Sequence, residues 1–270
     1  MARQRGLDQQ EYEEVEERRS VRAPVLYEVN RQRGVEEMER PVQSLWWSGV
    51  AAGFAISASV YCEGFLHMHL PDAEWRPLVE NLGYTVGFIV VIMAGFQLFT
   101  EQTVTAILPL LSDRTKANAS RTARLWGIVL LANMAGAFVA AAFGTLNPGT
   151  SPEQLAAFIA VSQHYTANGF VELLFLGIPA GFFIASLAWM LPNAEGGKFW
   201  LILLITYVIA LGGFAHVVAG MVEVFILVVT GNLSILTGLG SVILPTLIGN
   251  ILGGSALFAS IAYGQVSEEM

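Results

Sequence analysis

The sequence predicts an all-α membrane protein with six transmembrane helices, built as a 3+3 inverted repeat whose second and fifth helices are broken. Three observations lead to this prediction. Hydrophobic residues make up 54% of the 270 residues and charged residues only 13%, whereas an average soluble domain has about 25% charged residues. Apolar segments long enough to cross a bilayer follow one another along the chain. Motifs of the first half also recur in the second.

The polar N-terminus is expected to be a cytoplasmic extension, residues 1–40, which has no apolar stretch of the kind found in signal peptides. A solvated tail, a gating element and a partner-binding element all remain open for it. Residues 41–265 form the expected transmembrane channel domain, followed by a short cytoplasmic tail, 266–270. The net charge of −8 argues against nucleic acid as a partner.

Six apolar segments reach the roughly 20 residues that a helix needs to cross a bilayer core of about 30 Å. They are Val42–Leu66, Leu82–Leu111, Leu125–Phe143, Phe170–Leu191, Phe199–Thr230 and Ser241–Tyr263. Lys and Arg gather before the first segment and in the loops after the second and fourth, with Arg76 as the exception. Because positively charged loops stay in the cytoplasm, we expect a multi-pass protein of the inner membrane with both termini cytoplasmic.

The second and fifth segments are too long to be straight helices. At a rise of about 1.5 Å per residue each would measure about 45 Å, well over the bilayer core. Each contains glycine near its middle, Gly95 in the second and Gly212 and Gly213 in the fifth, where the backbone can leave the helix. Non-helical backbone at membrane depth is tolerated only where it is buried or lines a cavity. Two such breaks therefore predict a pathway through the protein.

The two halves share three motifs in the same order. Ala52-Gly53-Phe54-Ala55-Ile56 matches Ala180-Gly181-Phe182-Phe183-Ile184, Gly95-Phe96 matches Gly213-Phe214, and Asn133-Met134-Ala135-Gly136 matches Asn250-Ile251-Leu252-Gly253. Each half has three spans, an odd number, so the halves insert in opposite orientations. Inverted repeats with broken helices are typical of transporters whose substrate site lies near the bilayer midplane.

One ionisable residue, His216, falls at the second break. Ionisable groups within the membrane are costly and mark functional sites, and histidine changes charge near physiological pH. Thr100 and Asn250 could hydrogen-bond this histidine or the neighbouring backbone, and Asn133 has the corresponding place in the other half. The alternatives are a neutral histidine bonded to the structure and asparagines that only satisfy freed backbone groups.

Two carboxyl groups, Glu101 and Glu223, lie near the breaks and could face the vestibules, pair with other groups or carry protons. The spacing of His67 and His69 suggests a metal only weakly, because two ligands lack a partner cluster. We therefore expect no metal and no cofactor. Nucleophile-elbow, P-loop, dinucleotide-binding and zinc-protease motifs are all missing from the sequence, so an enzyme is not expected.

These motifs identify a resemblance over about residues 40–265: the chain resembles the formate/nitrite transporter family. Gly95-Phe96-Gln97-Leu98-Phe99-Thr100 is similar to that family's Gly-Ala-Asp/Glu-Leu-Phe-Thr motif, and Gly213-Phe214-Ala215-His216 to its Gly-Phe-Glu-His motif. The stretch Pro245–Gly254 is similar to the family's last-span signature. The stretch Glu80–Pro109 especially resembles the YfdC-like branch.

The resemblance implies an aquaporin-like protomer in a homopentamer, with a pore in each protomer for small monovalent anions or their conjugate acids. His216 would lie between two apolar constrictions and would hydrogen-bond Thr100. By position, the constrictions would be formed by Leu98, Phe99, Tyr84, Phe88, Ile184 and Ile209.

This chain departs from the family pattern at four positions. Gly181 stands where an asparagine is usual, which would remove a second partner of the histidine. Ala215 and Gln97 replace acidic residues, and Tyr165 falls where most members have a vestibule lysine. The neighbouring His164 could replace that lysine as the electropositive site. These departures bear on which anion passes.

The mechanism expected from these features is the passage of a weak acid. An anion crossing dry apolar constrictions loses its hydration at a large cost, whereas a neutral acid does not. The anion would therefore be protonated near His216 and cross as the neutral molecule. Two alternatives are an aquaporin-like pore for small neutral solutes, and a non-conducting membrane scaffold or sensor that signals through residues 1–40.

Overall fold

The computed structural model describes residues 21–269, which fold into helices joined by short turns. The first half contains α2 (Ala23–Glu39), α3 (Val42–Ala55), α4 (Ser57–His69), α5 (Arg76–Met93), α6 (Phe99–Thr105), α7 (Ile107–Ser112) and α8 (Lys116–Leu146). The second half contains α9 (Pro152–Thr166), α10 (Phe170–Met190), η1 (Leu191–Asn193), α11 (Lys198–Leu211), α12 (Val217–Val229), α13 (Ile235–Thr237), η2 (Gly238–Ile243), α14 (Leu244–Ile251), η3 (Leu252–Ala259) and α15 (Ser260–Val266). Here η1 is a 3-10 turn, and η2 and η3 are π-helical.

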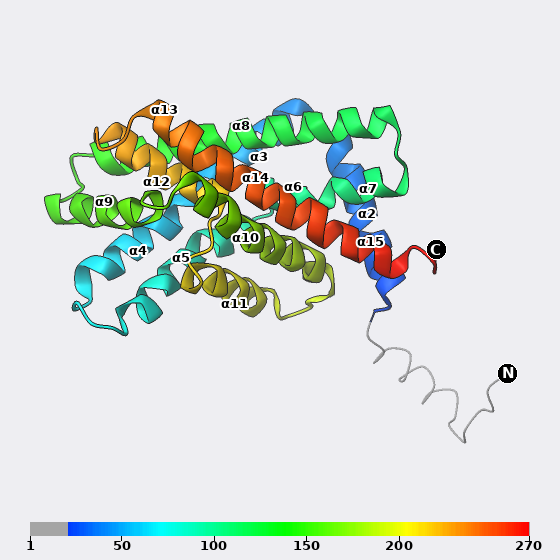
Figure 1. The fold of residues 1–270 in the computed structure, drawn as a ribbon, viewed down its shortest axis with the longest axis horizontal. Coiled ribbons are helices and arrows are strands. Elements are labelled where there is room, and N and C mark those ends of the chain that lie inside the picture. The colour runs from blue at the N-terminus through cyan, green and yellow to red at the C-terminus, as the bar shows by residue number, and fades with distance from the viewer. Residues whose placement is uncertain (1–20, 270) are drawn as a thin grey trace, which may run out of the picture.

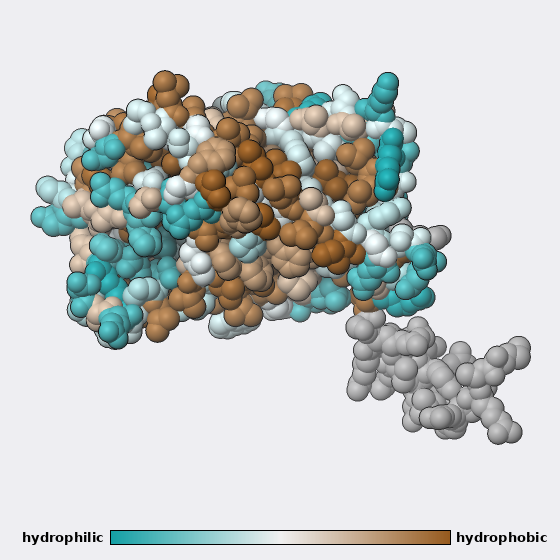
Figure 2. Space-filling view, in the orientation of Figure 1, coloured by the Kyte–Doolittle hydropathy of each residue, from teal (hydrophilic) through white to brown (hydrophobic). Residues whose placement is uncertain are grey.

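Five of the helical stretches are long and apolar enough to cross a membrane. They are Val42–His69, Arg76–Met93, Lys116–Leu146, Phe170–Asn193 and Ile235–Val266. The predicted segment 199–230 is divided between α11 and α12, which are apolar but shorter. Apolar residues cover the middle of the molecule and hydrophilic ones gather toward its two ends (Figure 2).

The elements divide between the two ends of the bundle. Helices α2, α7 and α15 lie at one end, and α9 and the turn between α4 and α5 lie at the other (Figure 1). The sequence prediction missed α9, a 15-residue helix that opens with a capping box between Ser151 and Gln154 and packs on α4 and α12. It was missed because it is shorter than a membrane span.

Helix α2 packs against the membrane domain, although its sequence is highly charged. It contacts α6, α7 and α8 and buries Tyr27, Asn30, Gly34 and Met38. The Tyr27 hydroxyl lies 2.8 Å from that of Ser112 on α7, and a side chain at Gly34 would collide with the main chain of Thr105. The described part of the extension is thus held on the bundle rather than solvated on all sides.

Two helix pairs are packed main chain against main chain: α3 with α8, and α10 with α14 and η3. A Cβ on Gly53 would meet the main chain of Asn133, and a Cβ on Gly181 would meet that of Asn250. Small residues permit such close approach between membrane helices. The same contact thus occurs in both halves and brings each asparagine beside a glycine of the shared Ala-Gly-Phe motif.

Each half also contains a helix that stops within the apolar region. Helix α5 ends at Met93 and α6 begins at Phe99, with Gly95 at φ 68° between them. Helix α11 ends at Leu211 and α12 begins at Val217, with Gly213 at φ 63°. These left-handed conformations are accessible to glycine at little cost. Gly212 has ordinary helical dihedrals and ends α11, so the chain turns at Gly213.

Candidate functional site

An asparagine holds the non-helical backbone at each break. Asn133 Oδ1 accepts a hydrogen bond from Phe99 N at 2.9 Å, and its Nδ2 donates to the carbonyls of Gly49 and Gln97, both at 2.8 Å. Buried main-chain groups need such partners when they leave the helix ladder.

The second asparagine repeats this arrangement. Asn250 Oδ1 accepts from Val217 N at 2.9 Å, and its Nδ2 donates to the carbonyls of Gly177 and Ala215 at 2.9 and 2.8 Å. Both asparagine side chains are fully buried. Each asparagine therefore holds the first residue of a short helix, Phe99 of α6 or Val217 of α12, and so sets the position of the residue before it.

That preceding residue at the second break is His216, which caps α12. Its Nδ1 accepts a hydrogen bond from Ala219 N at 3.3 Å, so Nδ1 carries no proton and Nε2 carries the hydrogen. Nε2 lies 2.7 Å from Thr100 Oγ1, and the imidazole therefore donates to the threonine oxygen. The hydroxyl hydrogen of Thr100 remains free to point elsewhere. This bond joins the two breaks directly, since Thr100 lies in the first turn of α6.

Apolar side chains surround this pair. The six residues expected at the constrictions are all buried and belong to one hydrophobic cluster: Tyr84, Phe88, Leu98, Phe99, Ile184 and Ile209. The Phe88 ring lies edge-on to the imidazole, with 4.8 Å between ring centroids. Moving a charge from water into these surroundings would cost much more free energy than moving a neutral group.

A cavity of about 570 Å³ opens next to His216 at the end of the bundle that carries α9. We call it the carboxyl cavity. Its walls include three of the predicted vestibule or altered positions, His164, Tyr165 and Glu223, together with Tyr84. They also include Glu63, which the sequence reasoning passed over. Glu63 lies within the first predicted span, and an ionisable residue inside an apolar segment is the feature that could have revealed it.

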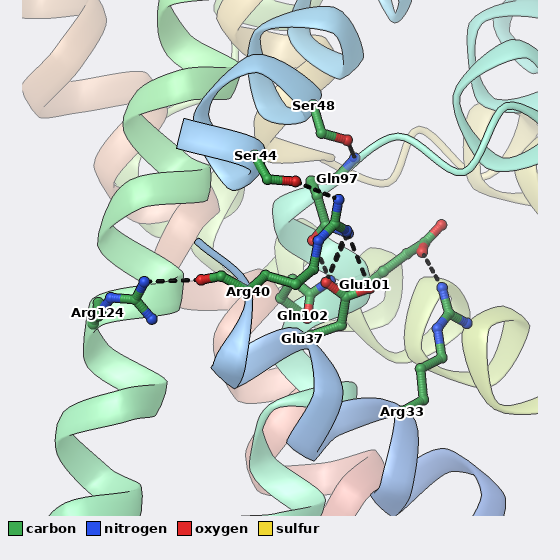
Figure 3. Close-up of polar contacts among 9 residues, drawn as sticks. All are labelled: Arg33, Glu37, Arg40, Ser44, Ser48, Gln97, Glu101, Gln102 and Arg124. Carbon is green, nitrogen blue, oxygen red and sulfur yellow. Dashed lines mark hydrogen bonds and ion pairs between the residues drawn. The ribbon is translucent and has the colours of Figure 1, made fainter. Parts of the chain in front are cut away.

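At the opposite end a polar network joins α2 to the first break (Figure 3). Gln97 Nε2 donates to Glu37 at 3.0 Å, and Gln102 donates to Gln97 at 2.8 Å. Arg33 lies 3.5 Å from the buried carboxylate of Glu101. The glutamine that replaces an acidic residue of the family motif thus bonds to an acidic residue of α2. A smaller cavity of about 350 Å³ at this end is lined by Arg33 and Lys198.

We expect Arg33→Gln to loosen α2, because Glu101 would then be a buried carboxylate without its cation. Removing one partner of such an ion pair leaves the buried charge uncompensated, so cleavage within α2 by a protease should accelerate about tenfold in detergent, which corresponds to about 1.4 kcal/mol. Arg31→Gln is the matched control, since Arg31 pairs with Glu28 of the same helix. Equal cleavage of the two variants would show that the Arg33–Glu101 contact does not hold α2.

Packing explains the glycine at position 181 without reference to the histidine. Because a Cβ there would meet the main chain of Asn250, the residue belongs to the contact between α10 and α14. The interpretation of Gly181 as a lost partner of His216 stays a prediction beside this packing role. Tyr165 bonds to Thr246 at 3.0 Å, and the buried Ala215 donates its N–H to the Leu176 carbonyl at 3.1 Å. Among residues 21–269, no group of three His, Cys, Asp or Glu side chains could hold a metal ion.

The sequence profile of the formate/nitrite transporter family matches residues 24–264. The chain belongs to the formate/nitrite transporter family. It is 40% identical over 255 residues to the inner membrane protein YfdC of Escherichia coli (strain K12). The aligned region covers 94% of this chain and 82% of YfdC. The predicted resemblance to the family and to its YfdC-like branch is therefore confirmed.

Two solved structures have the same fold. An FNT family ion channel superposes with a TM-score of 0.76 at 20% identity, covering 90% of this chain and 98% of that one. A pentameric formate channel with formate bound superposes with a TM-score of 0.69 at 20% identity, covering 84% and 98%. The all-helical membrane fold is thus that of a channel and transporter family.

Proposed function

We propose that this chain is an inner-membrane channel for small monovalent anions or their conjugate weak acids, and that passage is linked to protonation close to His216. The observation that carries the proposal is the Thr100–His216 hydrogen bond, which links both breaks at the edge of a cavity. Membership of the family and the formate bound to a channel of the same fold support the substrate class.

The proposed architecture is six spans in a 3+3 inverted repeat, with both termini in the cytoplasm and five protomers in the assembly. The hydrogen bonds by which Asn133 and Asn250 hold the two breaks, which we call the asparagine clamps, support the repeat. The two glycines at positive φ support it as well. The pentameric state of the solved formate channel supports the assembly. The arginines and lysine of the α2 end of the bundle support its cytoplasmic placement.

The hydrogen bonds of His216 favour its neutral form. A proton on Nδ1 would oppose the Ala219 N–H that now donates to this atom, and the resulting charge would lie among the apolar side chains that surround the break. The histidine would thus orient Thr100 and present a neutral, polar point between apolar walls. The substrate would cross this point as the neutral acid, with its proton acquired before it leaves the cavity.

We expect formate uptake into proteoliposomes to rise as the external pH falls, and His216→Asn to abolish uptake, because the neutral acid loses the polar point that His216 and Thr100 present. His69→Asn is the control, because His69 is exposed at the end of α4. Wild-type uptake and pH dependence in His216→Asn would overturn the role of the histidine. If the inserted wild-type protein shows no uptake above empty liposomes, formate is rejected and other small anions become the candidates.

A further inference from the structure

The carboxyl cavity contains more acidic than basic side chains, which is unexpected beside an anion pathway. The titratable and charged groups on its walls are Glu63 and His67 of α4, Asp72 of the following turn, Arg76, Glu80 and Tyr84 of α5, His164 and Tyr165 of α9, His216 at the break and Glu223 of α12. Four of these are carboxyl groups and one is an arginine. When all are ionised, such a cavity repels a small anion.

The acidic groups differ in their partners. At the rim, Arg76 lies 3.6 Å from Asp72 and 3.3 Å from Glu80, and Glu80 lies 3.0 Å from His67 Nδ1. Deeper in the cavity, Glu63 and Glu223 are only 8% and 6% exposed. Neither has a hydrogen bond or an ion pair with any other residue between 21 and 269. The rim carboxylates thus have Arg76 or His67 as partners, and the deep carboxyl groups have none among residues 21–269.

A second group points to a ligand at the same place. The Tyr84 side chain is 92% buried, lines the cavity, and its hydroxyl has no hydrogen-bond partner among the described residues. A buried polar group without a protein partner needs a water or a substrate. Its ring lies against Phe88, with 5.1 Å between centroids, and Phe88 contacts His216. Tyr84 therefore lines the same cavity as the two deep carboxyl groups, and its ring packs on the residue that contacts His216.

Two buried carboxyl groups in one cavity cannot both be ionised without a large cost, so such a pair binds a proton more tightly than a solvated carboxyl. We infer that Glu63 and Glu223 form a proton-loading pair that protonates the substrate anion in the carboxyl cavity, with Tyr84 as its hydrogen-bond donor. This inference rests on the proposed function and names the proton source for it. It also explains how the chain works without a vestibule lysine: the pair admits the anion when it holds its proton.

The proton transfer balances within the cavity. The O–H bond of the protonated carboxyl breaks as an O–H bond forms on the substrate carboxylate, which becomes a neutral acid, and the electron pair of the broken bond stays on the glutamate. The pair then takes a proton from the solution at the cavity mouth. His216 stays neutral throughout.

The test compares the pH profiles of formate and acetate uptake in proteoliposomes. If the pair supplies the proton, both acids share one midpoint and reach a plateau at acid pH, because the midpoint belongs to the protein. In Glu63→Gln with Glu223→Gln this shared plateau should be replaced by a separate plateau for each acid, reached only below that acid's own pKa. Uptake should then fall about tenfold for each pH unit above each acid's own pKa, as the bulk neutral acid becomes scarce. Glu74→Gln removes an exposed charge of the turn between α4 and α5 that does not line the cavity, and should leave the midpoint unchanged.

Separate midpoints for the two acids in the wild type would overturn the inference. A midpoint shift in Glu74→Gln as large as that in the double variant would overturn it as well. Infrared difference spectroscopy of the folded protein in detergent gives a readout that needs no transport. A protonated carboxyl band should persist at neutral pH in the wild type and vanish in the double variant. If no acid is transported but this band is present, the proposed substrate fails while the pair stands; absence of the band overturns the pair.

Discussion

Replacing Asn250 by alanine is expected to lower stability strongly and to abolish transport. The Val217 N–H and the Ala215 carbonyl both belong to the broken backbone and would lose their partner. An unsatisfied buried polar group costs about 1–3 kcal/mol, so the pair costs about 2–6 kcal/mol. His216 lies between these two residues, and its bond to Thr100 depends on their position. Thermal unfolding in detergent measures the first effect and proteoliposome uptake the second.

Two further variants sharpen this experiment. Asn133→Ala removes the equivalent contacts at the first break and should cost a similar amount. Asn147→Ala is the control, because within residues 21–269 the Asn147 side chain bonds only to Gly149 N in the loop after α8. An unfolding temperature for Asn250→Ala equal to that of the control would refute the clamp.

Substituting Gly181 with the family's usual asparagine is expected to damage the protein instead of restoring a partner for His216. The new Cβ would meet the main chain of Asn250, so α10 and α14 would have to separate. Overpacking of this kind costs about 1–3 kcal/mol or more, and here it also moves the clamp of the second break. The expected result is a lower unfolding temperature and loss of uptake.

Gly264→Asn provides the matched control, since a Cβ at Gly264 meets nothing within 4 Å. If Gly181→Asn were as stable as this control and transported faster than the wild type, position 181 would be open to the pore. The packing role derived from the structure would then be wrong.

Part of the site could be predicted from the sequence because glycine and ionisable residues are uncommon in the middle of long apolar segments. Glycine in the middle of an over-long apolar segment indicated both turns, and the structure has Gly95 and Gly213 at positive φ there. His216 and Thr100 were singled out by the same reasoning and lie within hydrogen-bond distance. The family assignment followed from these motifs and is confirmed.

Other features could not be derived because they depend on tertiary contacts. Helix α2 reads as a charged segment, and its buried residues Tyr27, Asn30, Gly34 and Met38 have a helical spacing too sparse to stand out. The role of Gly181 depends on how closely α14 approaches α10. The relation of Glu63 to Glu223 depends on the packing of α4 on α12, which no local pattern of either segment encodes.

The two asparagine clamps also constrain the order in which the protein can be assembled during synthesis. Each asparagine is translated 33 to 36 residues after the backbone groups of the break that it holds. A nascent chain that has inserted α8 can therefore complete its first break. The second break waits for α14, and a chain arrested just before Asn250 has His216 in the bilayer without the asparagine that holds the backbone on either side of it. The histidine site is thus among the last parts of the protomer to form, and a ribosome that stalls late leaves a half-built pore.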